Sequence, residues 1–133
     1  MIRGIRSEER GAAALEFALV APVFILFIIG IAQLGILFFA NAAVHSALAD
    51  GARAASMFPL PTDEAIRTEI SAQRFGLDSD HLDTPEIVHG ASGGTTFADI
   101  TLSYTVQLDF IFFQTDAVTL TESRRVFTQP AAA

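Results

Sequence analysis

The residue with the clearest chemical role is Glu16, a carboxylate directly in front of the apolar run Phe17–Ala40. If that run spans a membrane, an acid at its start is costly, about +2.5 to +3.5 kcal/mol at the centre of a membrane helix and less at its edge. Two explanations are open: the carboxylate snorkels to the headgroups, or it pairs with a cation inside the membrane or an assembly. Because acids in membrane helices are functional by default, we expect Glu16 to have a partner cation.

A second candidate is the acidic stretch Asp78–Asp83, which holds three aspartates and one histidine. It does not fit a calcium-binding EF-hand loop, because Leu82 and Asp83 stand where the pattern requires an acid or Asn followed by Gly. His89 occupies the place of the acid that closes such a loop. We therefore expect a solvated loop and no metal site.

No catalytic constellation is apparent in the chain. It contains no Cys, and no serine nucleophile motif accompanies its three histidines. The net charge is −7, and no basic patch follows the first ten residues, so nucleic acid is not an expected partner. We expect neither an enzyme nor a cofactor. The histidines are His45, His81 and His89.

The apolar run predicts a transmembrane helix within residues 12–40. Its 24 residues Phe17–Ala40 contain one polar side chain, Gln33. As a helix they span about 36 Å, enough to cross a hydrocarbon core of about 30 Å. We expect a kink at Pro22, which removes a backbone donor, and a hydrogen bond from Gln33 to a neighbouring helix.

Flanking charges predict the orientation of this helix. Arginines outnumber glutamates in the first ten residues, and the next arginine is Arg53. By the positive-inside rule the N-terminus faces the cytoplasm and the rest lies outside. An ordinary signal anchor would have the same flank. Ala40-Asn41-Ala42 also fits a signal-peptidase site, with a start at Ala43, but the preceding run is longer than cleaved signals usually have.

Gly11, four small or apolar residues, Glu16, an aromatic and a long apolar helix together resemble the class III signal of type IV prepilins. The resemblance implies that a membrane aspartic peptidase removes a leader, residues 1–11, by cutting between Gly11 and Ala12. Cutting creates an α-amino cation on Ala12. In a filament, Glu16 of one subunit would pair with Ala12 of a neighbour, in a setting of low dielectric where the pair is strong.

More narrowly, residues 10–55 resemble TadE-like proteins of the tight-adherence (Flp-type) pilus system. The residues that carry this resemblance are RGAAALEF at 10–17, Pro22, and Asp50-Gly51-Ala52-Arg53. Flp major pilins often have Tyr after the glutamate and are shorter, so Phe17 and the long C-terminal region favour a minor pilin or pseudopilin.

The resemblance implies a precursor in the bacterial inner membrane that serves pilus assembly in adhesion or biofilm formation. The implied partners are a prepilin peptidase, other tight-adherence pilus subunits, the inner-membrane assembly platform and membrane lipid. A different class of protein remains open: a permanently anchored single-pass protein whose outer head binds a partner in the envelope.

Beyond the membrane, residues 41–58 are expected to continue the helix as a stalk. Apolar residues recur there at a spacing of three to four, a stripe that suits a filament core or a helix bundle. Asp50 and Arg53 are one turn apart and are expected to pair. The residues of the stripe are Val44, Leu48, Ala52 and Ala55.

Residues 59–133 are expected to form a small extracytoplasmic α+β head of one helix and about three antiparallel strands. The helix is predicted at Asp63–Phe75, with Thr62 as N-cap and Gly76 as its stop. The strands are predicted at Pro85–His89, at 98–112 with period-two alternation and a bulge or bend, and at Ala117–Thr128.

The last two strands are predicted to meet in a turn at Gln114–Asp116, and the aromatics of Phe110–Phe113 suggest an interface as well as a core. A head of roughly 75 residues without disulfides has a marginal core and would depend on neighbouring subunits.

Overall fold

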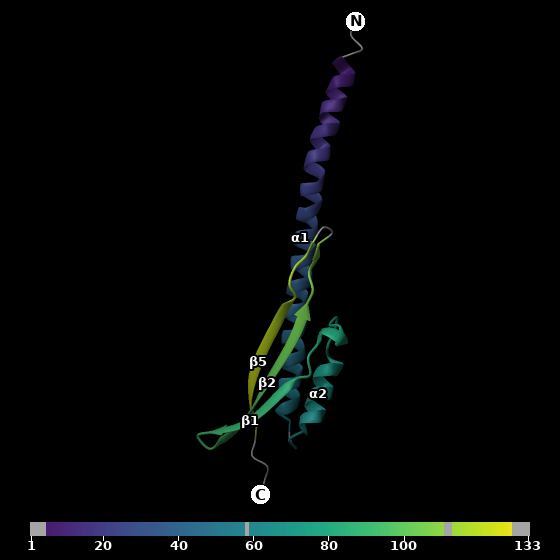
Figure 1. Ribbon diagram of the computed structural model, residues 1–133. Helices are drawn as coiled ribbons and strands as arrows, with labels where there is room; N and C mark the ends of the chain where they lie inside the picture. The colour runs from purple at the N-terminus through teal and green to yellow at the C-terminus, as the bar shows by residue number, and fades with distance from the viewer. Residues whose placement is uncertain (1–4, 58, 111–112, 129–133) are drawn as a thin grey trace.

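The computed structural model describes residues 5–57, 59–110 and 113–128, with side chains from Gly11 onward. It has the expected α+β architecture: one long N-terminal helix, then a short helix and antiparallel strands. Helix α1 (Ile5–Ala55) is 51 residues long. In Figure 1 its N-terminal half stands clear, while the sheet and the second helix lie along its C-terminal half.

Helix α1 ends in a tight final turn. The amides of Ser56 and Met57 donate to the carbonyls of Arg53 and Ala54, each three residues back. Pro59 follows and cannot extend a helix. The described helix therefore stops at Ala55, within the stretch 41–58 predicted to be helical.

Helix α2 (Asp63–Ala72) begins as predicted, because the hydroxyl of Thr62 accepts from the amide of Ala65 at 3.3 Å. Its predicted end at Phe75 was wrong. The helix ends at Ala72 with Gln73 as cap, and Gly76 then takes the left-handed conformation, φ 77°. Three residues between helix and glycine thus lie in the turn that leads to the 3₁₀ helix η1 (Ser79–His81).

The main sheet has the strand order β1-β2-β5 and is antiparallel throughout. Strand β1 (Glu86–Ser92) is longer than predicted and turns into β2 (Thr95–Val106) through Gly93 and Gly94, both at positive φ. Strand β5 (Val118–Thr128) returns along β2, with Val106 opposite Val118 and Thr96 opposite Thr128.

The predicted run to Phe112 is broken after Val106, in line with the expected bend. A two-stranded hairpin follows, formed by β3 (Asp109–Phe110) and β4 (Phe113–Gln114). The chain reverses between Phe110 and Phe113, so the predicted turn at Gln114–Asp116 was wrong. Residues 111 and 112, the end of the predicted strand, lie outside the described residues.

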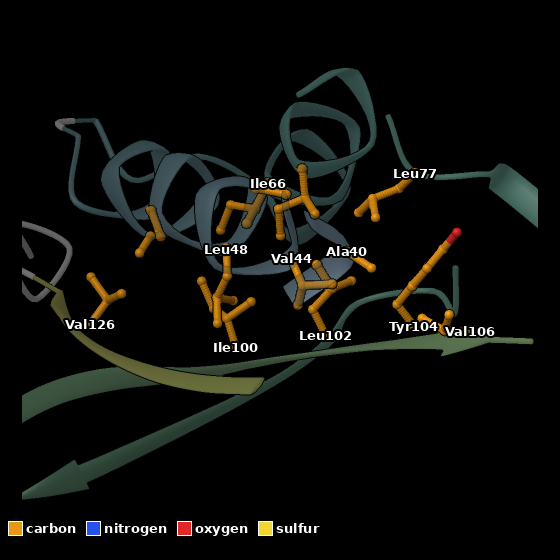
Figure 2. Close-up of a cluster of buried hydrophobic side chains, with 14 residues drawn as sticks. Ala40, Val44, Leu48, Ile66, Leu77, Ile100, Leu102, Tyr104, Val106 and Val126 are labelled. Carbon is orange, nitrogen blue, oxygen red and sulfur yellow. The ribbon is translucent and has the colours of Figure 1, made fainter. Parts of the chain in front are cut away.

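The core lies between the two helices and one face of the sheet. Figure 2 shows Val44 and Leu48 of α1 between Ile66 of α2 and Ile100 and Leu102 of β2. Each of these five side chains is at least 97% buried. Helix α1 packs on β2 and β5, and α2 packs on α1.

The predicted stripe of α1 is fully confirmed as buried, but its partner differs from the expectation. All four of its residues belong to the intramolecular core rather than to a surface left for a filament or a bundle. The head therefore gains its missing apolar area from α1 of the same chain. This also explains how a small α+β unit without disulfides closes a core.

Candidate functional site

The N-terminal half of α1 has the length, composition and exposure of a membrane anchor. The helix is long and apolar enough to cross a membrane, and only 6% of its most apolar 18-residue window is buried. Phe17 and Phe27 are 73% and 72% exposed. Water would oppose such exposure, whereas lipid chains would solvate it.

The predicted processing residues lie at the exposed end of this anchor. Gly11, Ala12 and Glu16 all sit on exposed turns of α1. Ala12 and Glu16 are four residues apart, so they lie on the same helix face. Within the residues whose side chains are described, no hydrogen bond or ion pair reaches the Glu16 carboxylate, so this group has bonding capacity left for another molecule.

Pro22 lies inside α1, where the helix continues without interruption. Its side chain is exposed, and its ring takes the place of one backbone donor. The carbonyl of Ala18 is therefore the natural acceptor for a polar group from outside this helix.

Gln33, the polar residue of the apolar run, is half-buried and bonds within its own chain. Its side-chain amide donates to the backbone carbonyl of Asp109, the first residue of β3. The expected partner was a neighbouring helix. In this structure the amide instead connects the membrane helix to the first residue of a β-hairpin.

The Asp50-Gly51-Arg53 motif serves the packing of the head. Arg53 lies 3.7 Å from the Asp50 carboxylate, the predicted one-turn pair. Gly51 is buried against α2, and a Cβ at this position would lie 2.6 Å from Cδ1 of Ile70. Glycine is thus required here for the close approach of the two helices.

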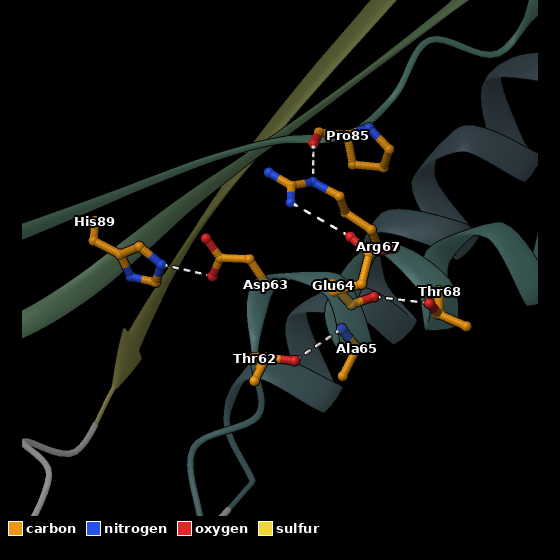
Figure 3. A network of polar contacts seen from close by, with 8 residues as sticks. All are labelled: Thr62, Asp63, Glu64, Ala65, Arg67, Thr68, Pro85 and His89. Carbon is orange, nitrogen blue, oxygen red and sulfur yellow. Dashed lines mark hydrogen bonds and ion pairs between the residues drawn. The ribbon is translucent and has the colours of Figure 1, made fainter.

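Two histidines that seemed isolated in the sequence join helices to the sheet. His89 of β1 contacts Asp63 at the start of α2 at 2.8 Å, as Figure 3 shows. His45 of α1 lies 3.1 Å from Glu122 of β5. No local pattern could have predicted these pairs, because each connects residues far apart in the chain.

Figure 3 also shows a hydrogen bond between α2 and the segment that precedes β1. Arg67 donates through Nε to the carbonyl of Pro85 at 3.1 Å, and its Nη1 lies 3.9 Å from Glu64 (Figure 3). The bond to Pro85 holds α2 beside the segment that enters β1, while the Glu64 contact is within α2. Both contacts engage polar groups of the head in structural roles rather than in a reactive site.

The acidic stretch is organised around η1. The carboxylate of Asp78 accepts from the amide of Asp80 at 3.0 Å, which caps this short turn. Among the described residues, no three His, Asp or Glu side chains gather in a way that could hold a metal ion.

The clearest electrostatic feature of the sheet is an ion pair on its outward face, between Asp99 and Arg125. The guanidinium of Arg125 donates to both carboxylate oxygens of Asp99 at 2.7 Å. These hydrogen bonds hold the pKa of Asp99 below its usual range and raise the pKa of Arg125. The two residues face each other directly across β2 and β5. The pair therefore supports the sheet register.

Of the predicted aromatic cluster at Phe110–Phe113, the structure describes the two end residues, and Phe110 lies beside α1. Phe110 and Phe113 stack with ring centroids 4.7 Å apart and an angle of 14° between their planes. Phe110 is half-buried and faces α1, whereas Phe113 is 54% exposed. Sequence alternation could not place this cluster, since the strand that carries it breaks before it.

Comparison with known proteins supplies one match. Residues 11–53 match the family model described as TadE-like protein, which covers about a third of the chain and begins at Gly11. Searches of curated proteins and of solved structures found no match. Residues 11–53 hold the exposed anchor, Glu16, Gln33 and the Gly51 contact, and over this segment the chain is similar to TadE-like, pilin-type proteins.

Proposed function

We propose that this chain is a minor pilin or pseudopilin of a tight-adherence pilus. The observation that carries the proposal is the TadE-like match that begins at Gly11, the first residue of the prepilin-like signal. The family is one of structural pilus components and not of enzymes. The role of the chain is therefore structural: it is anchored in the membrane, pairs with other pilus subunits and carries a folded head.

In this proposal a prepilin peptidase cuts between Gly11 and Ala12 and removes residues 1–11. The mature subunit is a single-pass protein of the bacterial inner membrane, with its N-terminus cytoplasmic and its head outside. Its membrane span lies within residues 12–40, followed by the rest of α1, which ends at Ala55, and then by the head 59–133. Its partners are other pilus subunits and the assembly platform.

Glu16 is the residue we expect to make the assembly contact. Its carboxylate is exposed and has the acceptor capacity for an α-amino cation, such as that of a neighbour's Ala12. Pairing would remove the cost of a lone carboxylate at the membrane boundary. The freed backbone at Pro22 and the exposed faces of α1 would pack against the same neighbours.

The decisive experiment is to determine the N-terminus of the mature protein by mass spectrometry of membrane fractions, with and without the prepilin peptidase. We expect a peptidase-dependent start at Ala12. Gly11→Val should block the cut, while Gly4→Val in the leader should not. An intact Met1 start would instead support the permanently anchored envelope protein, and a start at Ala43 an ordinary secreted domain.

A second experiment isolates the role of Glu16. Glu16→Ala should leave membrane insertion and cleavage intact but prevent the subunit from entering pilus assemblies. Glu9→Ala, which removes a carboxylate from the leader, is the matched control. Normal assembly of Glu16→Ala would refute the charge-pairing role.

A further inference from the structure

The β3–β4 hairpin lies beside the membrane helix, which its first strand, β3, contacts. Its first residue, Asp109, accepts from Gln33, and Phe110 completes an apolar groove of about 490 Å³ with α1 residues between Val23 and Leu34. Figure 1 shows this end of the β2–β5 region reaching along α1 toward its exposed half. A part of the head is therefore level with the apolar run.

Distances along α1 give the depth of the hairpin in a bilayer. At about 1.5 Å per residue, Gln33 lies about 26 Å from Glu16 and about 32 Å from Ala12. A hydrocarbon core is about 30 Å thick. If Glu16 and Ala12 sit at one boundary of the core, then Gln33 and the hairpin sit at the opposite boundary.

We propose that the β3–β4 hairpin is a lipid-contacting anchor, with the Phe110 and Phe113 rings at the edge of the hydrocarbon layer and acyl chains in the groove between Phe110 and α1. The surface continues that of the membrane helix, and its exposed ring, Phe113, is of a type that packs with lipid chains. This proposal rests on the membrane insertion of α1 and not on pilus assembly.

The chemistry of the hairpin suits this depth. Asp109 pairs with Gln114 and Phe110 with Phe113, and the carbonyl of Asp109 accepts from Gln33. The outer edges of a two-stranded ladder are not paired within it, which suits the boundary of the bilayer rather than its interior. The carboxylates of Asp109 and Asp116 are exposed. Because carboxylates are costly in hydrocarbon, they keep the hairpin at the boundary rather than deeper.

A second exposed ring marks the headgroup level above the hairpin. Phe75 is 84% exposed and lies beside Phe39 of α1. Phe39 is six residues beyond Gln33, or about 9 Å further from the bilayer centre. A protein partner would have to cover both rings while tolerating the aspartates, whereas the lipid boundary accommodates both kinds of group.

The test uses the absence of tryptophan from the chain. Three single-tryptophan variants of the full chain are reconstituted into phosphatidylcholine vesicles whose acyl chains carry bromine at a shallow or a deep position. Phe24→Trp reports the anchor, Phe113→Trp the hairpin, and Phe127→Trp the far end of β5. Phe127 is an exposed aromatic about 30 Å along β5 from the hairpin, and so is a matched control.

We expect deep bromines to quench Phe24→Trp most, shallow bromines to quench Phe113→Trp most, and neither to quench Phe127→Trp. Equal quenching of Phe113→Trp and Phe127→Trp would overturn the proposal. So would a Phe113→Trp signal that changes only as the protein-to-lipid ratio rises, which would assign this surface to a second copy. An unquenched Phe24→Trp would remove the premise that α1 is inserted, and mapping of the mature N-terminus would still test the pilin role separately.

Discussion

The side-chain amide of Gln33 donates a hydrogen bond to the backbone carbonyl of Asp109, 76 residues later in the chain. This bond joins the polar residue of the apolar run to the first residue of the β3–β4 hairpin. It explains why a polar side chain persists there: both groups would otherwise be unsatisfied where water is scarce. The membrane helix and the head are thus linked by more than the chain between them.

Replacement of Gln33 tests this link. Gln33→Leu should leave membrane insertion intact, since it lengthens the apolar run, but should loosen the hairpin by about 0.5 to 1.5 kcal/mol, the usual net worth of one hydrogen bond. Hydrogen exchange in lipid should show faster exchange at Phe113–Thr115. The turn at Gly93–Gly94, at the other end of the sheet, provides the internal control. Unchanged exchange at Phe113–Thr115 would show that the bond contributes nothing.

The contact at Gly51 predicts an asymmetry among the helical glycines. Gly51→Ala places a methyl group against Ile70, so it should destabilise the head by about 1 to 3 kcal/mol through overpacking. Gly35→Ala is the matched control, because nothing lies within 4 Å of a Cβ there. That change should be neutral or stabilising by up to about 1 kcal/mol. Denaturant unfolding in detergent micelles measures both, and equal effects would contradict the close-packing role.

Much of the fold could be predicted from local patterns. The apolar run predicted α1, and the alternation at 98–106 predicted the central strand, β2. Thr62 predicted the start of α2. The stripe of α1 was also correct as a buried face. Periodicity reports which side of an element is buried but not what covers it, so the same stripe was assigned to other subunits instead of to the chain's own sheet.

The features that could not be predicted all depend on long-range contacts. Phe110 pairs with Phe113 and lies against α1, a partner that no local rule identifies. Likewise, the contacts of His89 with Asp63 and of Gln33 with Asp109 form only when the sheet packs against the helices. For the candidate site, GAAALEF at 11–17 carried the pilin-type assignment, while the position of the hairpin beside α1 needed the structure.

The core makes α1 and the head a single unfolding unit. Leu48→Ala in α1 should therefore cost as much as Leu102→Ala in β2, about 2 to 5 kcal/mol each, because both side chains are at least 97% buried in the same cluster. Ser46→Ala, which alters an exposed side chain of α1, is the control and should change little. Denaturant unfolding followed by sheet circular dichroism provides the measurement. A head that unfolds unchanged in Leu48→Ala would mean that α1 is only a tether.

The ion pair on the outward face predicts a pH dependence with a defined sign. Because Arg125 lowers the pKa of Asp99 in the folded state, the folded chain favours the ionised carboxylate. The stabilisation is therefore complete above the unfolded pKa of about 3.9 and is lost as pH falls through the lower folded value. Asp99→Asn should lower the melting temperature of the head at neutral pH. The difference in melting temperature from the unaltered chain should shrink as pH falls below about 4 and disappear below the folded pKa of Asp99.

The matched control for this pair is Asp83→Asn, which removes an exposed carboxylate that makes no ion pair among the described residues. Its melting temperature should follow that of the unaltered chain across the same pH range. Arg125→Lys should reproduce part of the loss, since a lysine cannot donate to both Asp99 oxygens or lie flat over Phe97, 4.0 Å from the guanidinium carbon. If the gap between Asp99→Asn and the unaltered chain persisted at low pH, the loss would come from the altered side chain itself and not from the charge that Arg125 stabilises.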